Sequence, residues 1–372
     1  MSKKKVFYVL SGAILGVGVV LAIFILTFGI NLNSGVSLEE KNVTEHKESN
    51  ELKPMTAGLG LNSDTYLDVG DDPEKIDVLE VKQITTDGGY YPKRWSPNGA
   101  YIAVVKSGHT LLFDADGKMV KKFDRTFRNW SLDSKKIICA GMWLVDVESG
   151  EKKKVTEEKG YNPAFLPSGD RVIYHSKDGL SIVDINTGKT ETLINGPDDN
   201  FSDIWYVSDD KIFYVRGKRK ERDHYLYRYN SITKEERKIY SYRVIAPVYL
   251  LTPKGEIVIR NGPDPKSGYS IITDENGEII SDAANFARGD WNMALIDFSP
   301  NGKLLLFIEY DQDEHIVTRH DLYIYSLDGM KKKGITNTKT VIEWEPKWSP
   351  NGDKIFYTDW DENIFLMTIT KK

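Results

Sequence analysis

The sequence has a single cysteine among its 372 residues, Cys139, which excludes an internal disulfide framework and any metal centre built on a cysteine cluster. It has no basic excess either, because 50 Lys and Arg are outnumbered by 55 Asp and Glu and the net charge is −5. Contacts to phosphate need a basic surface, so we expect no nucleic-acid partner. Cys139 lies in an apolar stretch, residues 136–140, where a free thiol acts as a small hydrophobic side chain.

Catalytic signatures are scarce as well. The string nearest to the G-x-S-x-G motif of serine hydrolases, Gly268–Ile272, lacks the second glycine and lies inside a predicted strand. Aspartate pairs such as Asp114 and Asp116 resemble the start of a calcium-binding loop, but none is followed by the glycine and glutamate that such a loop requires. We therefore expect no catalytic residue, no metal and no cofactor.

Only one long hydrophobic run is present, Val6–Ile30. As a helix these uncharged residues extend about 37 Å, which is enough to cross the ~30 Å hydrocarbon core of a bilayer. Lys3–Lys5 precede the run and no Lys or Arg follows it until Lys41, so the positive-inside rule places residues 1–5 in the cytoplasm and the rest of the chain outside. The run is longer than a signal-peptide core and is followed by no Ala-x-Ala site. We predict an uncleaved single-pass anchor over residues 6–30, with a cleaved export signal as the alternative.

Residues 31–75 contain scattered charges together with Gly, Ser, Asn and Asp, and they show no sustained hydrophobic period. This composition is typical of a flexible linker. We predict that the segment is a flexible stalk that holds the following domain, residues 76–372, away from the membrane.

A short turn motif recurs along residues 76–372. Its tightest copies read Trp-Ser-Pro-Asn-Gly at Trp95–Gly99 and Trp348–Gly352, and Phe-Ser-Pro-Asn-Gly at Phe298–Gly302. Looser copies bring the total to seven, at intervals of 35 to 50 residues: Trp130–Ser134, Phe165–Gly169, Val207–Asp210 and Leu251–Gly255. A recurrence of this length is typical of a repeat architecture.

The repeats share one order of elements: a strand that ends in the motif, an alternating strand, a further strand, a tight turn that often contains glycine and, except in the last repeat, a short fourth strand. Four strands in about 42 residues predict an all-β fold, a seven-bladed β-propeller, with six blades as the fallback because the fourth motif has neither proline nor glycine. The last repeat lacks its outer strand, whereas Ile76–Ile84 has strand character but no repeat of its own. Pairing Ile76–Ile84 with Ile364–Ile369 would close the ring and remove two open sheet edges.

At these turns the chain resembles the TolB-like, WD-related propeller repeats of bacterial envelope proteins, over residues 76–372. The resemblance implies a propeller that acts as an extracytoplasmic interaction platform. The same repeats also form the propeller of prolyl oligopeptidase-type enzymes. The resemblance is therefore a better guide to the fold than to the function. The predicted anchor departs from soluble TolB, and TolB's own partners are therefore not carried over.

The turns between the second and third strands of the repeats predict where a partner binds. They are short in the first three repeats and lengthen in the next three, at Arg216–Asp223, Asn261–Gly268 and Asp311–Arg319. Long loops on neighbouring blades, on one face, are predicted to form a raised rim. The rim residues that we assign to partner binding are basic on one blade and acidic with histidine on another: Arg216, Lys218, Arg219, Lys220, Arg222, Asp311, Asp313, His315 and His320. The alternatives are solvated hairpin tips, or a metal site in the second group, although its spacing matches no metal-binding motif.

An aromatic residue begins the innermost strand of each repeat: Tyr91, Phe127, Tyr161, Trp205, Tyr242, Trp291 and Trp344. These rings either surround the mouth of the propeller channel, where they stack on sugars or peptide side chains, or pack between blades. We add Trp291 and Trp344 to the predicted partner-binding residues.

Together these patterns predict a membrane-anchored extracytoplasmic propeller that binds a protein or glycan partner in the cell envelope and contacts the membrane through residues 6–30. The alternative is an envelope enzyme, of sugar lyase or hydrolase type, with its site in the propeller channel. The two differ in whether carboxylates and histidines converge at one mouth of the channel, which sequence spacing does not determine.

Overall fold

The computed structural model describes residues 67–218, 224–240, 248–251, 257–261, 269–274, 276–281, 293–313, 316–326, 331–338 and 342–372. The chain divides into two compact units, Met1–Glu51 and Leu52–Lys372, and every described residue belongs to the second. The predicted cytoplasmic tip, the predicted membrane span and most of the predicted stalk lie outside the described residues. Within the described ranges, no helix is long and apolar enough to cross a membrane.

The described secondary structure consists of strands β1–β28 and one short 3-10 helix, η2 (Pro73–Lys75), and the strands form seven four-stranded antiparallel sheets. We number the sheets in chain order. Sheet 1 contains β2 (Tyr91–Trp95), β3 (Tyr101–Lys106), β4 (His109–Asp114) and β5 (Met119–Phe123); sheet 2 contains β6 (Phe127–Trp130), β7 (Lys136–Cys139), β8 (Trp143–Asp146) and β9 (Lys152–Lys154). Sheet 3 contains β10 (Tyr161–Phe165), β11 (Arg171–His175), β12 (Gly179–Asp184) and β13 (Thr190–Asn195); sheet 4 contains β14 (Asp199–Ser208), β15 (Lys211–Lys218), β16 (His224–Asn230) and β17 (Glu236–Tyr240).

The remaining three sheets complete the set. Sheet 5 contains β18 (Val248–Leu251), β19 (Ile257–Asn261), β20 (Tyr269–Thr273) and β21 (Ile279–Ser281); sheet 6 contains β22 (Met293–Phe298), β23 (Leu304–Asp313), β24 (Ile316–Ser326) and β25 (Lys332–Gly334). Sheet 7 combines the two ends of the domain, with β26 (Trp344–Trp348), β27 (Lys354–Thr358), β28 (Ile364–Lys371) and, outermost, β1 (Ile76–Gln83). The sheets therefore number seven, as predicted, and not the fallback six.

The predicted closure of the ring is confirmed by the pairing of β1 with β28. The two strands are antiparallel and in register from Ile76 opposite Lys371 to Gln83 opposite Phe365. Ile76 is fully buried. The N-terminal strand therefore supplies the edge that the last repeat lacks, and it leaves no open edge on β28.

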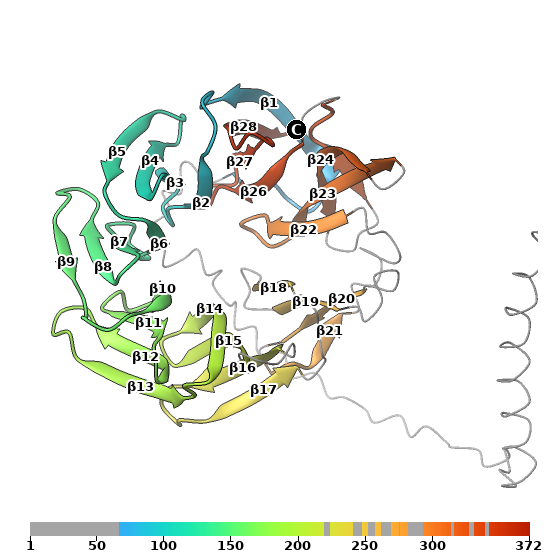
Figure 1. Cartoon of the computed structure of the whole chain (residues 1–372). Coiled ribbons are helices and arrows are strands. Elements are labelled where there is room, and N and C mark those ends of the chain that lie inside the picture. The colour runs from blue at the N-terminus through green and yellow to red at the C-terminus, as the bar shows by residue number, and fades with distance from the viewer. Residues whose placement is uncertain are drawn as a thin grey trace, which may run out of the picture. The chain divides into compact units, whose positions relative to one another are not determined.

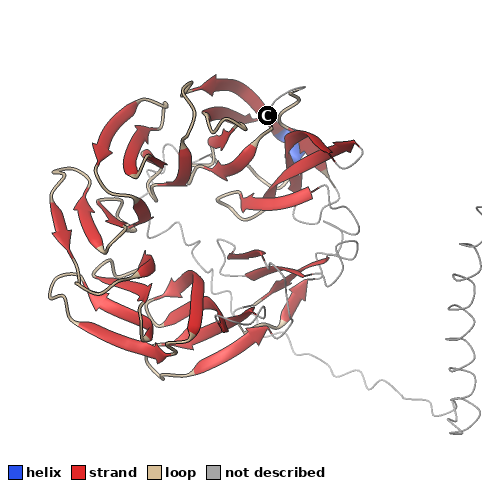
Figure 2. Cartoon of the chain, in the orientation of Figure 1, coloured by secondary structure: helices blue, strands red, loops and turns tan. Residues whose placement is uncertain are grey.

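The sheets follow one another around a centre, with the first strand of each on the inside (Figure 1), and the coloured elements are almost all strands (Figure 2). Neighbouring innermost strands contact each other, as β2 contacts β6 and β26 contacts β2. The hydrophobic core lies between sheets: Leu306 of sheet 6 packs with Ile355 of sheet 7, and Trp95 of sheet 1 packs with Phe356 of sheet 7. This arrangement is that of a β-propeller.

The serine of the turn motif explains why the motif recurs. The Ser96 hydroxyl is fully buried, donates to Asn98 Oδ1 (2.8 Å) and accepts from the Tyr101 backbone N–H (2.9 Å). One side chain thus satisfies the backbone at the point where the chain reverses into the next strand. The same acceptor role recurs at Ser131, Ser299 and Ser349.

Two of the motif tryptophans, Trp95 and Trp130, connect their sheets to the preceding one. Trp95 Nε1 donates to the Lys347 carbonyl of sheet 7 (3.3 Å), and Trp130 Nε1 donates to the Arg94 carbonyl of sheet 1 (3.5 Å). Because Trp95 and Trp130 are almost completely buried, these bonds satisfy indole N–H groups that would otherwise lie unpaired in the core.

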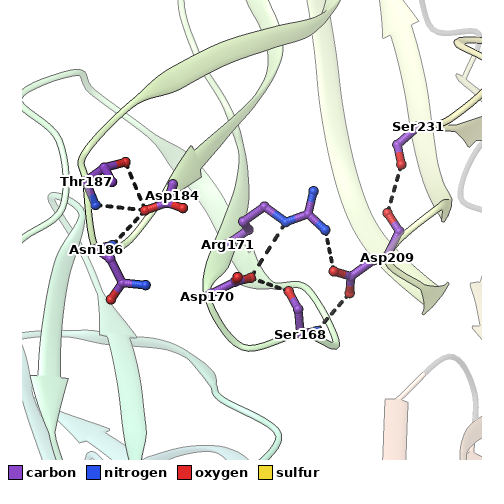
Figure 3. Close-up of polar contacts among 8 residues, drawn as sticks. All are labelled: Ser168, Asp170, Arg171, Asp184, Asn186, Thr187, Asp209 and Ser231. Atoms are coloured by element: carbon purple, nitrogen blue, oxygen red, sulfur yellow. Dashed lines mark hydrogen bonds and ion pairs between the residues drawn. The ribbon is translucent and has the colours of Figure 1, made fainter.

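The fourth motif, at residues 207–210, makes a turn without proline or glycine by using aspartate contacts to sheets 3 and 4 (Figure 3). Asp209 pairs with Arg171 of sheet 3 and accepts from the Ser168 backbone N–H (2.8 Å). The Asp209 carbonyl accepts from the Ser231 hydroxyl (3.0 Å). The Asp209 carboxylate therefore stabilises the junction with sheet 3, and its backbone carbonyl links the turn to sheet 4.

The end of the predicted stalk belongs to the domain instead. Val69 is 1% exposed, the Leu67 backbone N–H donates to the Asn351 carbonyl (2.7 Å), and Asp72 pairs with Lys331 (3.0 Å). The prediction of a flexible stalk up to residue 75 is therefore wrong for residues 67–75. The sequence misled because these few apolar residues are too sparse to form a period.

Candidate functional site

A pocket of about 310 Å³ opens where sheet 7 meets sheet 1. It is formed by the starts of β2 and β26 and by the turn between β27 and β28. These segments share one side of the domain, the pocket face, which carries the turns between second and third strands and the connections between sheets. The opposite side, which carries the Ser-Pro-Asn-Gly turns, is called the turn face. The pocket is lined by Tyr90, Tyr91, Pro92, Trp344, Glu345, Thr358, Asp359, Trp360 and Glu362.

The turn between β27 and β28 is fixed against the connection that leads from β1 into β2. Gly88 N donates to Asn363 Oδ1 (2.9 Å), Gly89 N donates to the Asp361 carbonyl (3.2 Å), and the Asp359 carboxylate accepts from Asn363 N (2.7 Å). Gly88 has φ +61°, and a Cβ there would lie 2.7 Å from the Asp361 carbonyl oxygen. The close approach therefore requires glycine, and it holds this wall of the pocket in place.

Large aromatic side chains are exposed at the pocket. Trp360 is 68% exposed and Tyr91 is 48% exposed. The Trp344 ring lies 6.4 Å from the Trp360 ring at 42°, and on another side it contacts the His320 ring edge-on at 4.5 Å. Exposed aromatic rings grouped at a hollow are typical of a binding surface.

His320 supports Trp344 from behind. It is 2% exposed and its Nδ1 lies 3.2 Å from the Glu343 carbonyl. Burial lowers the pKa of His320. The prediction that His320 belongs to an exposed rim is therefore wrong, because β24 begins at Ile316 and position 320 lies inside the sheet.

A buried carboxyl group lies beside this support. Glu343 is fully buried, and its Oε1 accepts from the Thr338 hydroxyl (2.8 Å), whereas its Oε2 has no hydrogen-bond partner. The pKa of Glu343 is raised to about 7, chiefly by burial and in smaller part by the nearby Asp321 carboxylate. An ionised Glu343 is thus costly in this environment.

The pocket itself is acidic. Glu345, Asp359 and Glu362 line it, and no described Lys or Arg does. Tyr91 donates a hydrogen bond to Glu362, and this bond raises the pKa of Tyr91. Carboxylates grouped in a hollow attract positively charged groups.

Cations of the chain itself already lie over the pocket tyrosines. Lys106 Nζ lies 3.7 Å from the centre of the Tyr90 ring and pairs with Asp87 (2.8 Å), and Lys93 Nζ lies 5.8 Å from the centre of the Tyr91 ring. The two rings therefore accept cations on their π faces.

The basic residues of the predicted rim fall into two groups. Arg216 lies inside β15, where it pairs with Asp199 (2.6 Å) and Glu236 (2.7 Å). Its predicted role as a loop charge at the rim is wrong, because its guanidinium group is engaged within sheet 4. Lys218 ends β15 and is exposed. Arg219, Lys220 and Arg222 lie outside the described residues, so their role stays a prediction.

The acidic part of the predicted rim is a longer hairpin than the sequence indicated. Asp311 and Asp313 belong to β23 and lie opposite Arg319 and Ile316 of β24. The predicted loop at 311–319 is therefore wrong in its boundaries, since a polar stretch with alternating residues pairs as a strand. His315 lies outside the described residues.

The strand-start aromatics do not form a uniform set. Tyr91 and Trp344 come together in the pocket, Tyr161 is 61% exposed, and Phe127 is 2% exposed and packs between sheets. Some of these rings are therefore exposed and others pack in the core, and stacking of the exposed rings on a partner stays a prediction. The side chains that lie outside the description are those of Trp205, Tyr242 and Trp291.

Two further predictions concern metals and the thiol. Within the described ranges, no group of three or more His, Cys, Asp or Glu is placed to hold a metal ion.

Cys139 is fully buried between sheets 1 and 2, and burial raises its pKa to about 12. The thiol therefore stays protonated and acts as a core side chain, as predicted.

Sequence reasoning missed the turn that builds the pocket. The turns between second and third strands in the first and third sheets consist of small or polar residues, whereas the turn of sheet 7 reads Asp359-Trp360-Asp361-Glu362. A tryptophan at a turn tip has no packing role in its own hairpin. That departure from the repeat was the available signal.

No protein-family model and no curated protein matches the sequence. Solved structures that resemble it include an oligogalacturonate lyase in complex with manganese, at 12% identity over 78% of this chain and 94% of that chain with a TM-score of 0.57. The β-propeller domain of Cps50 (Swd1) from Myceliophteria thermophila matches at 15% identity over 79% of this chain and 100% of that chain, with a TM-score of 0.54. TolB from Acinetobacter baumannii matches at 14% identity over 78% of this chain and 79% of that chain. Its TM-score of 0.42 is too low to support a structural conclusion.

At these identities the likeness shows the fold alone. The predicted resemblance to TolB-like and WD-related propellers is thus confirmed as a β-propeller fold, and the chemistry must be argued from the site.

Proposed function

We propose that the protein is a membrane-anchored binding module that holds a protein partner of the cell envelope on the pocket face of its propeller. The observation that carries this proposal is the pocket between sheets 7 and 1, where exposed Trp360 and Tyr91 lie beside three carboxylates and no described Lys or Arg is in the lining. Exposed aromatic residues at a preformed hollow supply contact area at low entropic cost.

The anchor is part of the same proposal. Residues 6–30 are uncharged and long enough to span a bilayer, and Lys3–Lys5 precede them. A reporter enzyme fused after Lys372 is expected to be active only outside the cytoplasm. Activity of the fusion inside the cytoplasm would overturn the orientation.

A lyase or hydrolase remains the alternative, and one observation weighs against a substrate like that of the solved lyase. Oligogalacturonate is a polyanion, and the pocket would present it with Glu345, Asp359 and Glu362. Like charges at a site disfavour binding. A glycan partner without charge is less affected, and it forms a separate arm of the test below.

The proposal is tested by capture from crosslinked membranes with the full chain as bait. Replacing both Tyr91 and Trp360 with Ala should remove a specific protein from the captured set, because both side chains are exposed at the pocket. The melting temperature should be nearly unchanged, since surface substitutions rarely shift stability by more than about 0.5 kcal/mol.

The matched control is Ile232→Ala, because Ile232 is 75% exposed and lies in the turn between β16 and β17 on the turn face. This variant should capture the partner as well as the unmodified chain does. Equal capture by the pocket double variant would show that the pocket does not hold the partner and would sink the proposal.

A further inference from the structure

We infer that the pocket recognises a cationic side chain, an arginine or lysine presented by the protein partner. The inference rests on the proposed function and adds the chemistry of recognition. It begins from the lining, which combines aromatic rings with three carboxylates and no described Lys or Arg.

Size restricts the occupant to something small. A volume of about 310 Å³ lies at the lower end of the ~300–1,000 Å³ that ligand pockets span. The hollow therefore accommodates one long side chain and not an extended chain of sugars.

Charge decides the chemical class. An anion would meet Glu345, Asp359 and Glu362 at close range, and a neutral sugar would displace water from these carboxylates without neutralising them. A cation neutralises the charge of these carboxylates and also interacts with the π faces of the exposed rings. A guanidinium group is favoured, because it stacks on aromatic faces and forms paired hydrogen bonds with a carboxylate.

Geometry favours a cation as well. Trp344 and Trp360 meet at 42° with ring centres 6.4 Å apart, so they form a corner and not a flat platform for a sugar ring. Glu345 follows Trp344 directly on β26 and is exposed. The side chain that enters the corner is thus met by rings on two sides and by a carboxylate at the opening.

The backing of the corner keeps it in shape before the ligand arrives. Trp344 is held from behind by buried His320, and the turn that carries Trp360 is bonded to Gly88 and Gly89 in the connection between β1 and β2. Fixed walls reduce the entropy lost on binding.

The test titrates short peptides into the full chain in detergent micelles and follows the indole N–H signals of Trp344 and Trp360 by NMR, assigned with single Trp→Phe variants. The probes are acetyl-Gly-Arg-Gly-amide, its lysine analogue, and its citrulline analogue, which has nearly the same shape as arginine but no charge. Acetyl-Gly-Glu-Gly-amide and maltotriose complete the set.

The arginine peptide should shift both indole signals and bind at least tenfold more tightly than the citrulline peptide. The glutamate peptide and maltotriose should leave both signals in place. Equal binding of the arginine and citrulline peptides, or tighter binding of maltotriose, would overturn the inference.

Substitutions at the pocket provide the second readout. Glu345→Gln and Glu362→Gln should each weaken the arginine peptide at least threefold, whereas Glu80→Gln on β1, an exposed acid on the outermost strand of the same sheet, should not. Unchanged affinity in both pocket variants would contradict a role for charge.

The two proposals fail differently. If the pocket double variant loses the captured protein but the peptides show no preference for charge, the binding module stands and the cation inference falls. If the arginine peptide binds as expected but capture is unaffected by the double variant, the proposed function falls.

Discussion

The turn face and the pocket face of this propeller are built from the same strands but from different kinds of residue. On the turn face, Ser96, Ser299 and Ser349 are buried and make the same contact in successive sheets. On the pocket face, Trp360 and Tyr91 are exposed, and their hollow forms where only two sheets meet. Residues that recur hold the fold together, and residues that depart from the repeat are free to bind.

The comparison predicts that stability is lost most completely where the ring is closed. Deleting residues 76–84 removes β1, exposes the edge of β28 and empties the site of fully buried Ile76. We expect loss of cooperative thermal unfolding and rapid digestion by protease. Deleting residues 31–66, which precede the described domain, should leave the melting temperature nearly unchanged, and equal damage from the two deletions would contradict the closure.

A pair of tryptophan substitutions compares the two faces directly. Trp130, at the end of β6 before the motif turn, is 1% exposed, and its ring stacks on the Tyr101 ring with the ring centres 6.4 Å apart. Trp360 in the pocket is 68% exposed. Trp130→Ala should lower the free energy of unfolding by about 3–5 kcal/mol. Trp360→Ala should change it by less than about 0.5 kcal/mol. Denaturant unfolding measures both, and a large loss in Trp360→Ala would mean that this side chain is structural.

Because Glu343 is buried behind the pocket, we expect the free energy of unfolding to depend on pH. The pKa of Glu343 rises from 4.5 to about 7 on folding, so the folded state favours the neutral acid. Its contribution is fully present below pH 4.5 and is lost as the pH rises through about 7, by up to about 3 kcal/mol.

Glu343→Gln cannot ionise, so its stability should fall less between pH 5 and pH 8 than that of the unmodified chain. Urea unfolding at several pH values measures this slope, which is independent of any constant cost of the amide. Parallel curves for the two proteins would show that Glu343 is not the titrating group.

The smallest expected effect concerns a single motif serine. Ser349 is 1% exposed and accepts from the Lys354 backbone N–H (3.0 Å). Ser349→Ala should cost about 1–2 kcal/mol, because it leaves a buried donor unpaired. The control is Ser149→Ala, in an exposed turn of sheet 2, which should lower the free energy of unfolding by less than about 0.5 kcal/mol. A similar loss in both variants would contradict a stabilising role for the buried motif serine.

The sequence was sufficient to predict the sheets, their number and the closing strand, because the turn motif at Trp95–Gly99 repeats and each copy is a local signal. It was not sufficient for the site. Trp360 and Tyr91 are far apart in the chain and meet only because β1 and β28 close the ring. His320 looked exposed among polar neighbours, but the hairpin of β23 and β24 extends past it and buries it beneath Trp344.

The central claim is that a partner binds on the pocket face, and a photo-crosslinking amino acid placed at single positions of the full chain tests it most directly. The positions are Trp360 in the pocket, Lys220 in the predicted rim and Ile232 on the turn face. We predict a discrete protein adduct from position 360 after irradiation of intact cells, and none from position 232. An adduct from position 220 together with 360 would extend the site to the rim. No adduct from position 360, or the same adduct from position 232, would contradict the account.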